Sequence, residues 1–411
     1  MVYNIILYFY AFCAHVVALF QHKVALMVQG QRNTFPLLQE RLVKDAPYIW
    51  FHAASLGEFE QGRPLMERLR ATYPQYKLLL TFFSPSGYEV RKNYGGADLV
   101  CYLPFDTPGH ARRFVEMVKP KMVFFIKYEF WMNYLCALRQ NNIPLYSVSS
   151  IFRPDQLFFR SYGKSYVKAL RCFTHFFVQN EASKRLLGQL SIDQVTIVGD
   201  TRFDRVVDIR NEAKDVPIMS AFNPQGCKVL VVGSSWTPDE NMLLPYFNAH
   251  PELKLVLAPH VVTEEHLVEI EQKLQRPAVR FTKASPERIA QADCLIMDCY
   301  GLLSSIYRYG TVAYVGGGFG VGIHNVPEAA VYGVPVLIGP NNKRFQEAQA
   351  LLKCGGCMEV DSAASFETLM NALLQDEKKI EAAGNASARY IQAHAGATAR
   401  VFEKCFHSCT F

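Results

Sequence analysis

The chain has 411 residues, half of them hydrophobic, which is too long for one ordinary core and predicts two domains. Charged residues make up 19% and aromatic residues 13%, a composition that excludes disorder over most of the chain. A net charge of +6 suits anionic ligands or a membrane surface, but it is no nucleic-acid signature, and we expect no nucleic-acid partner.

The first segment, "MVYNIILYFYAFCAHVVALF", is almost free of polar residues and carries no Lys or Arg before Lys23. It lacks the leading positive charge and the cut site of a cleavable signal peptide. We interpret residues 1–28 as a hydrophobic membrane-associating helix, which either spans the bilayer or lies in its interface. The alternative is an internal helix that docks on the protein itself. The basic residues that follow would hold the next domain on the cytoplasmic side.

Residues 29–208 alternate short apolar runs with amphipathic stretches. The runs are continuous, as expected of parallel strands buried on both faces. We predict strands at "YIWFHAAS", "KLLLTFF", "LVCYLPFD", "MVFFIKY", "PLYSVSS", "HFFVQ" and "VTIVGD", and helices at Gly62–Thr72, Pro108–Val118 and Glu181–Leu190. The pattern predicts a doubly wound sheet of the Rossmann kind.

Two of these predicted strands end in a carboxylate. Glu58 follows "YIWFHAAS" at the start of a helix, and Glu129 follows "MVFFIKY", beside Lys127. A carboxylate in the first turn of a helix is also favoured by the helix dipole alone. Two carboxylates at neighbouring strand ends, however, are what acid–base chemistry on a hydroxyl requires.

A basic run, "RSYGKSYVKALR", spaces Arg160, Lys164, Lys168 and Arg171 along one predicted helical stripe. The default interpretation is a solvated basic face. The apolar first segment makes a phosphate-rich membrane ligand the alternative.

The pattern breaks around 205–226, which we interpret as an interdomain linker, and then restarts. Residues 209–411 are predicted to form a second Rossmann-like domain, with a ligand cleft between the two. We predict its strands at "KVLVVGSS", "LKLVLAPH", "AVRFT", "CLIMD", "TVAYVGG" and "PVLIG".

The second domain carries a glycine run, "VGGGFGVGIHNVPEAA", between a strand and a helix. Such a loop lets backbone N–H groups approach phosphate, although it fits neither the dinucleotide nor the P-loop fingerprint. Asn325 and Glu328 lie at the predicted helix start, where Glu328 could accept hydrogen bonds from ribose hydroxyls. The alternative is that the two residues form a capping box. Ser234 and Ser235 are candidate phosphate contacts, and His260 ends a neighbouring strand.

No metal site is predicted. The lone C-x-x-C, Cys354 to Cys357, has no second pair or suitably spaced His, so its glycines read as a helix end and turn. No D-x-D occurs that would hold a metal for a nucleotide diphosphate. The other cysteines are scattered in apolar runs, as in a cytoplasmic protein with reduced thiols.

In sum these motifs resemble the 3-deoxy-D-manno-octulosonic acid (Kdo) transferases of lipopolysaccharide assembly. The resemblance runs nearly end to end through "FHAASLGEFEQGRPL", "TFFSPSGYE", "YLPFDTPGHARRF", "YEFWMN", "GDTRFD", "VGSSW", "YVGGGFGVGIHNVPEAA" and "VLIGP". It implies a GT-B fold and an inverting glycosyltransferase, without a metal or other cofactor, on the cytoplasmic face of the inner membrane. It also implies CMP-Kdo as donor and a lipid A precursor of the lipid IVA type as acceptor.

The resemblance assigns roles to particular residues. Glu58 is expected to be the general base, Glu129 to assist it, and Arg202 to stabilise the transition state where the family has lysine. The donor-binding set is expected to comprise Ser234, Ser235, Pro259, His260, Tyr300, Gly301, Leu302, Gly317, Gly318, Asn325, Val326, Pro327 and Glu328. The acceptor-binding set is expected to comprise Ser55, Gly57, Ser84, Ser86, Lys127, Arg160 and Lys164.

Three other interpretations stay open at this stage. The nearest is a GT-B transferase that uses a UDP-sugar. Competition between CMP and UDP for binding would distinguish it from a Kdo transferase. A second is a catalytically silent membrane scaffold, against which the retained carboxylates argue. The third is a soluble dehydrogenase. The glycine run does not match the dinucleotide-binding fingerprint, and this mismatch and the apolar first segment argue against it.

Overall fold

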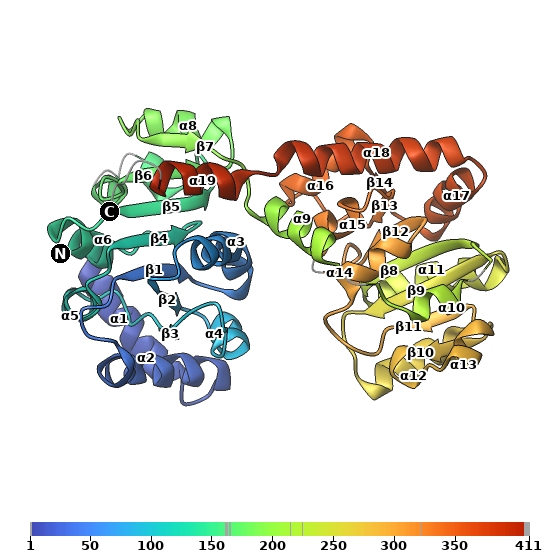
Figure 1. The fold of residues 1–411 in the computed structure, drawn as a ribbon, viewed down its shortest axis with the longest axis horizontal. Coiled ribbons are helices and arrows are strands. Elements are labelled where there is room, and N and C mark those ends of the chain that lie inside the picture. Colours follow the sequence, from blue (N-terminus) through green and yellow to red (C-terminus); the bar gives the residue numbers. More distant parts are fainter. Residues whose placement is uncertain are drawn as a thin grey trace. The chain divides into compact units, whose positions relative to one another are not determined.

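The computed structural model describes residues 2–160, 163, 166–213, 215–223, 225–320 and 322–406. The chain divides into two compact units, each built on a parallel sheet (Figure 1). The first unit comprises Met1–Arg205 and Ala395–Phe411, and the second comprises Val206–His394. The predicted α/β class with two doubly wound sheets is thus confirmed.

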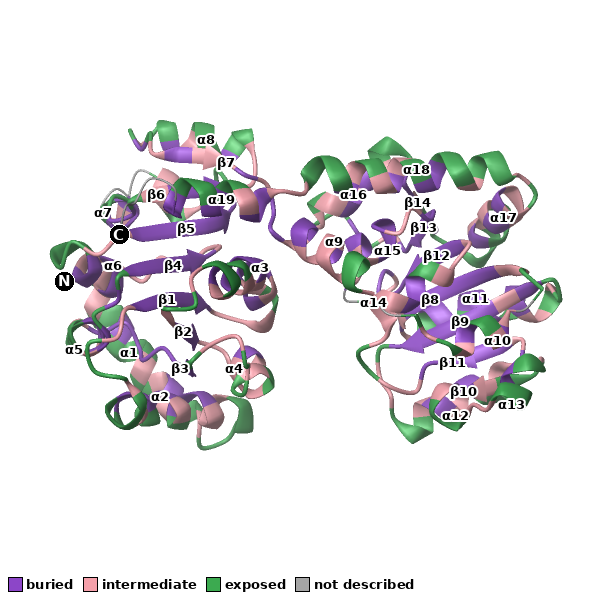
Figure 2. Cartoon of the chain, viewed as in Figure 1, coloured by how far each residue is buried: buried purple, intermediate pink, exposed green. Residues whose placement is uncertain are grey.

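Within the described residues, the first unit has a seven-stranded sheet in the order β3-β2-β1-β4-β5-β6-β7. The strands coincide with the seven predicted runs, because each run is apolar enough to be buried on both faces (Figure 2). They are β1 (Tyr48–Ala53), β2 (Lys77–Phe82), β3 (Leu99–Tyr102), β4 (Met122–Ile126), β5 (Leu145–Ser150), β6 (His175–Val178) and β7 (Val195–Ile197).

Helices cover both faces of this sheet. They are α1 (Val2–Val17), α2 (His22–Arg41), α3 (Leu56–Thr72), α4 (Pro85–Arg91), α5 (Pro108–Val118), α6 (Met132–Gln140), α7 (Val167–Leu170), α8 (Glu181–Gly188) and α19 (Ala397–Phe406), with a 3₁₀ turn at Leu157–Phe159. Helix α2 approaches β3 closely at Gly30, where a Cβ would lie 2.2 Å from the ring of Tyr102. The predicted helices are confirmed, and α3 begins at Leu56, close to the helix start predicted at Glu58, where Ser55 and Glu58 cap it.

Helix α1 turns one face to the first unit and leaves the other uncovered. Its inner side buries Leu7 and Ala14. Its exposed large apolar side chains are Val2, Ile5, Ile6, Tyr8, Phe9, Tyr10, Phe12, Val16 and Val17. No helix in the described part of the chain combines the length and the apolar character needed to cross a bilayer.

The single basic stripe predicted on one helix is wrong. Arg160 lies in extended backbone after a 3₁₀ turn, whereas Lys168 lies in the four-residue α7 and Arg171 at its end. Lys164 falls outside the described residues. The glycine at position 163 packs against the backbone of Leu157, where a Cβ would lie 1.7 Å from its carbonyl oxygen.

The second unit has a seven-stranded parallel sheet among its described residues, in the order β10-β11-β9-β8-β12-β13-β14. The six predicted strands are confirmed, and β14, which follows the glycines interpreted as a helix end and turn, was not predicted. The strands are β8 (Lys228–Ser235), β9 (Leu253–Pro259), β10 (Ala278–Arg280), β11 (Cys294–Ile296), β12 (Val312–Val315), β13 (Val336–Ile338) and β14 (Cys357–Glu359).

The helices of the second unit fill the connections between these strands. They are α9 (Arg202–Glu212, which begins in the first unit), α10 (Ile218–Phe222), α11 (Thr237–Ala249), α12 (Glu264–Lys273), α13 (Pro286–Ala290), α14 (Leu303–Ile306), α15 (Val326–Ala330), α16 (Gln346–Cys354), α17 (Ala363–Leu374) and α18 (Glu377–His394). The C-x-x-C glycines do form a helix end, since Gly355 closes α16 in the left-handed region at φ 80°.

The domain limits require two corrections. The segment predicted as a linker is largely helical, because it contains α9 and α10. The end of the chain was predicted to belong to the second domain, but α19 packs on the first sheet. Phe402 and Phe406 join its core, and Asp204 accepts a 2.6 Å hydrogen bond from the backbone N–H of Thr398 at the start of α19.

Candidate active site

The carboxyl ends of β1, β2 and β4 lie side by side in the first sheet, since β1 pairs with both of its neighbours. Helix α3 follows β1 directly and places Glu58 in its first turn. The Glu58 carboxylate accepts a 3.0 Å hydrogen bond from the backbone N–H of Ser55. Glu58 therefore takes part in a capping box with Ser55, which was not predicted, at the strand end where a carboxylate was expected.

The electrostatic surroundings of Glu58 oppose its charged form. Burial raises the pKa of this carboxyl above its ordinary value, and the charge of Glu129 raises it further. His52, Lys127 and the hydrogen bond from Ser55 act in the opposite direction without cancelling the rise. A carboxylate with a raised pKa holds a proton more strongly, which makes it a better general base near neutral pH.

Glu129, in the loop after β4, is held by two ring nitrogens. The indole Nε1 of Trp131 donates to Glu129 Oε2 at 2.6 Å. The Nε2 of the fully buried His52 lies 3.3 Å from the same oxygen. These two contacts fix the position of the Glu129 carboxylate. The pair of carboxylates predicted at neighbouring strand ends thus lies within electrostatic reach.

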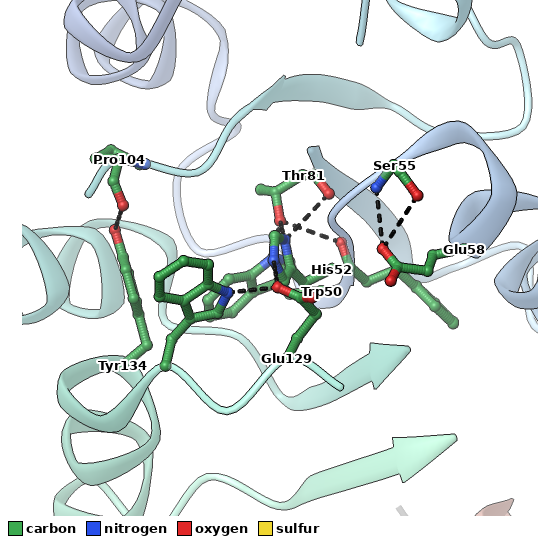
Figure 3. Close-up of polar contacts among 10 residues, drawn as sticks. Trp50, His52, Ser55, Glu58, Thr81, Pro104, Glu129 and Tyr134 are labelled. Carbon is green, nitrogen blue, oxygen red and sulfur yellow. Dashed lines mark hydrogen bonds and ion pairs between the residues drawn. The ribbon is translucent and has the colours of Figure 1, made fainter. Parts of the chain in front are cut away.

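His52 lies between Thr81 and Glu129 in Figure 3. Its Nδ1 is 2.9 Å from the hydroxyl of Thr81, and that hydroxyl accepts a 2.7 Å hydrogen bond from Trp50 Nε1. The same Nδ1 lies 3.2 Å from the carbonyl oxygen of Thr81, and the Thr81 hydroxyl donates to the carbonyl oxygen of Phe51 at 3.4 Å. His52 thus links Thr81 to Glu129 through contacts of both ring nitrogens.

Arg202 begins α9, and its guanidinium is held by Asp200. Arg202 Nε donates to Asp200 Oδ2 at 2.9 Å, and the backbone N–H of Arg202 donates to Oδ1 at 2.9 Å. Although burial acts to raise the pKa of Asp200, the charge and hydrogen bonds of Arg202 hold it below its ordinary value. The cation is thereby fixed in place.

Tyr128 feels the charges of both Glu58 and Arg202, and it was not singled out from the sequence. Burial raises the pKa of its phenol, as do the charges of Asp200 and Glu58, whereas Arg153 and Arg202 lower it. The phenol is therefore within electrostatic reach of both Glu58 and Arg202. The signal was present, because Tyr128 directly precedes Glu129, but a tyrosine after a strand is indistinguishable from a packing residue.

Of the other residues predicted to bind the acceptor, those at or just after the ends of β1, β2 and β4 are Ser55, Gly57, Ser84, Ser86 and Lys127, whereas Arg160 follows the 3₁₀ turn at Leu157–Phe159. Ser84 caps α4 and shares a 2.9 Å hydrogen bond with Ser86. The backbone N–H of Ser84 donates to Ala54 O at 2.7 Å, which joins this loop to the end of β1. A Cβ at Gly57 would meet nothing within 4 Å, so α3 begins at an open surface. Lys127 lies at the end of β4 with φ 61°.

In the second unit, Asp239 organises the glycine run. It lies in the first turn of α11 and accepts hydrogen bonds from three donors. They are the backbone N–H of Trp236 at 2.9 Å, the backbone N–H of Gly317 at 3.0 Å and the hydroxyl of Tyr314 at 2.6 Å. Gly317 has φ 91°, and a Cβ at Gly318 would lie 2.5 Å from the backbone of Gly339. Asp239 was not singled out from the sequence.

Asn325 and Glu328 meet at the start of α15, as their spacing predicted. Asn325 Nδ2 donates to Glu328 Oε1 at 2.7 Å. The Oδ1 of Asn325 is buried and has no hydrogen-bond partner within the described part of the chain. A buried acceptor without a donor is costly, so this oxygen marks a place for a ligand hydroxyl or amino group. Val326 and Pro327 are buried beneath it.

The environment of Ser235 is not the one expected for a phosphate contact. Its side chain is fully buried, and its hydroxyl donates to Glu240 Oε1 at 2.8 Å. Glu240 Oε2 lies 2.9 Å from His266 Nε2, so the pair ties the end of β8 to α12. The neighbouring Ser234 is less buried and adopts the left-handed region at φ 54°.

His260 is part of an aromatic stack. Its ring stacks on Trp236 with centroids 4.6 Å apart and on His324 with centroids 4.5 Å apart. Burial and the neighbouring His260 lower the pKa of His324, which suits its 3.1 Å hydrogen bond from Trp236 Nε1. Pro259 ends β9 immediately before this stack.

The remaining predicted donor residues lie together after β11. Tyr300 is 73% exposed, and its hydroxyl accepts a 3.1 Å hydrogen bond from the backbone N–H of Val262. Gly301 has φ 94°, and Leu302 precedes α14. Within the described ranges, no group of three or more His, Cys, Asp or Glu side chains could hold a metal ion.

Comparisons with known proteins identify the relatives of this chain. Residues 30–205 match the family model for 3-deoxy-D-manno-octulosonic-acid transferase. The Kdo transferase of Haemophilus influenzae is 25% identical over 371 residues, 86% of each chain. That of Aquifex aeolicus is 26% identical over 342 residues, 81% of this chain and 88% of the relative. The expected family resemblance is thereby confirmed.

Solved structures support the fold. UDP-GlcNAc 2-epimerase from Neisseria meningitidis, bound to UDP-GlcNAc, superposes with a TM-score of 0.62 at 14% identity. The match covers 88% of this chain and all of the epimerase. At this identity the likeness concerns the fold alone, two parallel-sheet α/β domains.

Proposed function

We propose that this chain, which carries a Kdo transferase domain, transfers Kdo from CMP-Kdo to a lipid A precursor of the lipid IVA type. The observation that carries the proposal is the carboxylate pair in the matched region, Glu58 with its raised pKa beside the charged Glu129. An unassisted hydroxyl is a poor nucleophile near neutral pH, and a positioned base of this kind contributes on the order of 10²–10⁴-fold.

In the proposed reaction, Glu58 takes the proton of the acceptor hydroxyl as its oxygen bonds to C2 of Kdo. The bond between Kdo and the CMP phosphate breaks, the electron pair leaves with CMP, and the configuration at C2 is inverted. Lys127 and the serines around Glu58 would bind the acceptor. Arg202, held by Asp200 in a fixed position, would stabilise the developing charge without a metal.

The second unit is proposed to bind the CMP part of the donor. Its glycine run brings backbone N–H groups to the end of β12, held there by Asp239. The unpaired Oδ1 of Asn325 would accept from a ribose hydroxyl, and Glu328 lies beside it. The aromatic stack of Trp236, His260 and His324 offers a flat face at the ends of β8 and β9.

The outer face of α1 is proposed to rest on the cytoplasmic face of the inner membrane, where the acceptor resides. Support comes from the large apolar side chains that this face exposes, including Phe9 and Phe12. Replacing both by serine should remove most binding to anionic lipid vesicles in a flotation assay. Val90→Ser, at an exposed position of α4, is the control and should bind as the native chain does. Equal flotation of the double variant would contradict this placement.

The direct test uses purified protein in detergent with CMP-Kdo and tetraacylated lipid A precursor, followed by mass spectrometry of the lipid. We expect the lipid to gain the mass of one or more Kdo units as CMP is released. No gain, in protein that binds CMP, would reject the proposed acceptor or the activity itself. Competition between CMP and UDP for the same protein distinguishes the proposal from a transferase that uses UDP-sugars.

A further inference from the structure

The start of helix α6, at Met132 directly after Trp131, takes its hydrogen-bond partners from distant segments. The backbone N–H groups of Asn133 and Tyr134 donate to the two carboxylate oxygens of Asp106, at 3.0 and 2.9 Å. The backbone N–H of Met132 donates to the hydroxyl of Tyr3 at 3.3 Å. These are groups that a helix leaves unpaired at its start.

Helix α1 supplies part of this arrangement directly. The hydroxyl of Tyr3 donates to Asp106 Oδ2 at 2.6 Å, and the side-chain amide of Asn133 donates to Asn4 Oδ1 at 2.9 Å. Tyr3 and Asn4 lie in the first turn of α1. Burial raises the pKa of Asp106 to about 6, opposed by its hydrogen bonds from Tyr3 and the start of α6. Tyr3 and Asp106 therefore act together as the cap of α6.

A second route of contacts joins the same two segments. The ring of Tyr10 on α1 lies 5.8 Å from that of Phe105, centroid to centroid. Phe105 lies 6.1 Å from Phe83, and Phe83 lies 4.9 Å from Trp131. These separations are typical of interacting aromatic pairs. The rings thus form a continuous packed row from α1 to the indole that holds Glu129.

The cap needs this external help because Trp131 occupies the N-cap position of α6. An indole is a donor only, so it cannot accept a hydrogen bond from the helix N–H groups. Its N–H instead donates to Glu129 Oε2 at 2.6 Å. Any shift in the start of α6 would move Trp131 and, through this hydrogen bond, the carboxylate whose charge acts on Glu58.

We propose that α1 is a positioning element of the active site, in which Tyr3 and Asp106 hold the start of α6 and thereby set the place of Glu129. The proposal rests on the function proposed above, since it gives Glu129 its catalytic context. It assigns to the first helix a role in the chemical step that is separate from any contact with lipid.

The test compares Tyr3→Phe with Tyr8→Phe in the full chain. Both variants remove one hydroxyl from α1, but Tyr8 is 57% exposed and serves as the matched control. For Tyr3→Phe we expect kcat for Kdo transfer to fall about tenfold, the effect of losing one buried hydrogen-bonded group. The KM for CMP-Kdo should stay unchanged, because the donor is bound by the second unit.

A pH profile provides the readout that a purely structural role would not move. With Glu129 displaced, its charge raises the pKa of Glu58 less, so the acidic limb of kcat should shift to lower pH in Tyr3→Phe. Tyr8→Phe should retain the native limb. Loss of activity with an unchanged limb, or a native kcat in Tyr3→Phe, would overturn the proposal.

Hydrogen exchange separates this proposal from the proposed function. Amide exchange in a peptide covering residues 129–135 should quicken in Tyr3→Phe and not in Tyr8→Phe, whether or not the native protein transfers Kdo. Unchanged exchange in Tyr3→Phe would overturn the cap. If exchange is faster in Tyr3→Phe but the native protein transfers no Kdo, the proposed function is rejected, and so is the positioning of its base. The result would then support only the capping of α6 by Tyr3 and Asp106.

Discussion

Each unit begins its sheet with a strand that lies inside the sheet, and each places a carboxylate directly after that strand. Glu58 follows the central strand β1 in the first turn of α3, and Asp239 follows the central strand β8 in the first turn of α11. Both accept a hydrogen bond from the backbone N–H three residues earlier, at 3.0 and 2.9 Å. The position alone therefore does not distinguish a structural carboxylate from a catalytic one.

What differs is the surroundings of the two carboxylates. Asp239 is almost fully buried and also accepts from Tyr314 and Gly317, so its oxygens hold a loop in place. Glu58 instead has the charged Glu129 within reach, and burial and that charge raise its pKa. A carboxylate supplied with donors holds structure, whereas one that faces another carboxylate is prepared to take a proton.

The strongest test of this contrast is Glu58→Gln. Removing the base should lower Kdo transfer on the order of 10²–10⁴-fold, while leaving the affinity for CMP-Kdo unchanged. Transfer would be followed by mass spectrometry of the lipid and binding by calorimetry. Glu116→Gln, an exposed position on α5, is the control and should keep full activity. Loss of CMP-Kdo binding in a folded Glu58→Gln protein would contradict the division between the units.

The corresponding change in the second unit is Asp239→Asn. The amide of asparagine would place an N–H group opposite donors that hydrogen-bond to the carboxylate in the native protein. The glycine run would then lose the hydrogen bonds that hold it in place. We expect affinity for CMP to fall about tenfold, from the roughly 1–3 kcal/mol attached to an unsatisfied buried group. Calorimetric titration with CMP measures this. Glu381→Gln, exposed on α18, is the control, and equal affinities in both variants would remove the structural role of Asp239.

A third change weakens the electrostatic contrast without removing the base. Glu58 must be deprotonated to accept a proton, so transfer should decline as pH falls through its raised pKa. Glu129→Gln removes one of the two causes of that rise, and burial remains. The acidic limb of the kcat profile should therefore move to lower pH, by an amount that measures the effect of Glu129. An unmoved limb would mean that another group controls it.

The smallest expected effect concerns the stability of the first unit. Asp204 accepts from the backbone N–H groups of Gly396 and Thr398 at the start of α19. Asp204→Ala should lower the free energy of unfolding by about 1–2 kcal/mol, the usual effect of losing a cap. Urea denaturation monitors this loss. Affinity for CMP should not change. A loss of CMP binding in Asp204→Ala would show that donor binding by the second unit depends on the stability of the first.

The strands could be predicted from the sequence because the runs that form them are apolar throughout. The same patterns placed Glu58 and Glu129 at neighbouring strand ends. His52 and Asp239 could not be identified, because their roles depend on partners such as Thr81 and Gly317, far away in the sequence. The assignment of α19 failed for the same reason. Its helical periodicity shows an apolar face in Phe402 and Phe406, but periodicity does not say which sheet that face covers.

The return of α19 to the first unit has a consequence for synthesis on the ribosome. The second unit, Val206–His394, is inserted into the first, so all of its residues emerge before residues 395–406 do. Domains generally fold as units while the chain grows, usually with the N-terminal one first. Here we expect the order of completion to be reversed. The first sheet would wait with the surface around Phe124 and Tyr73 uncovered until Phe402 and Phe406 arrive to cover it.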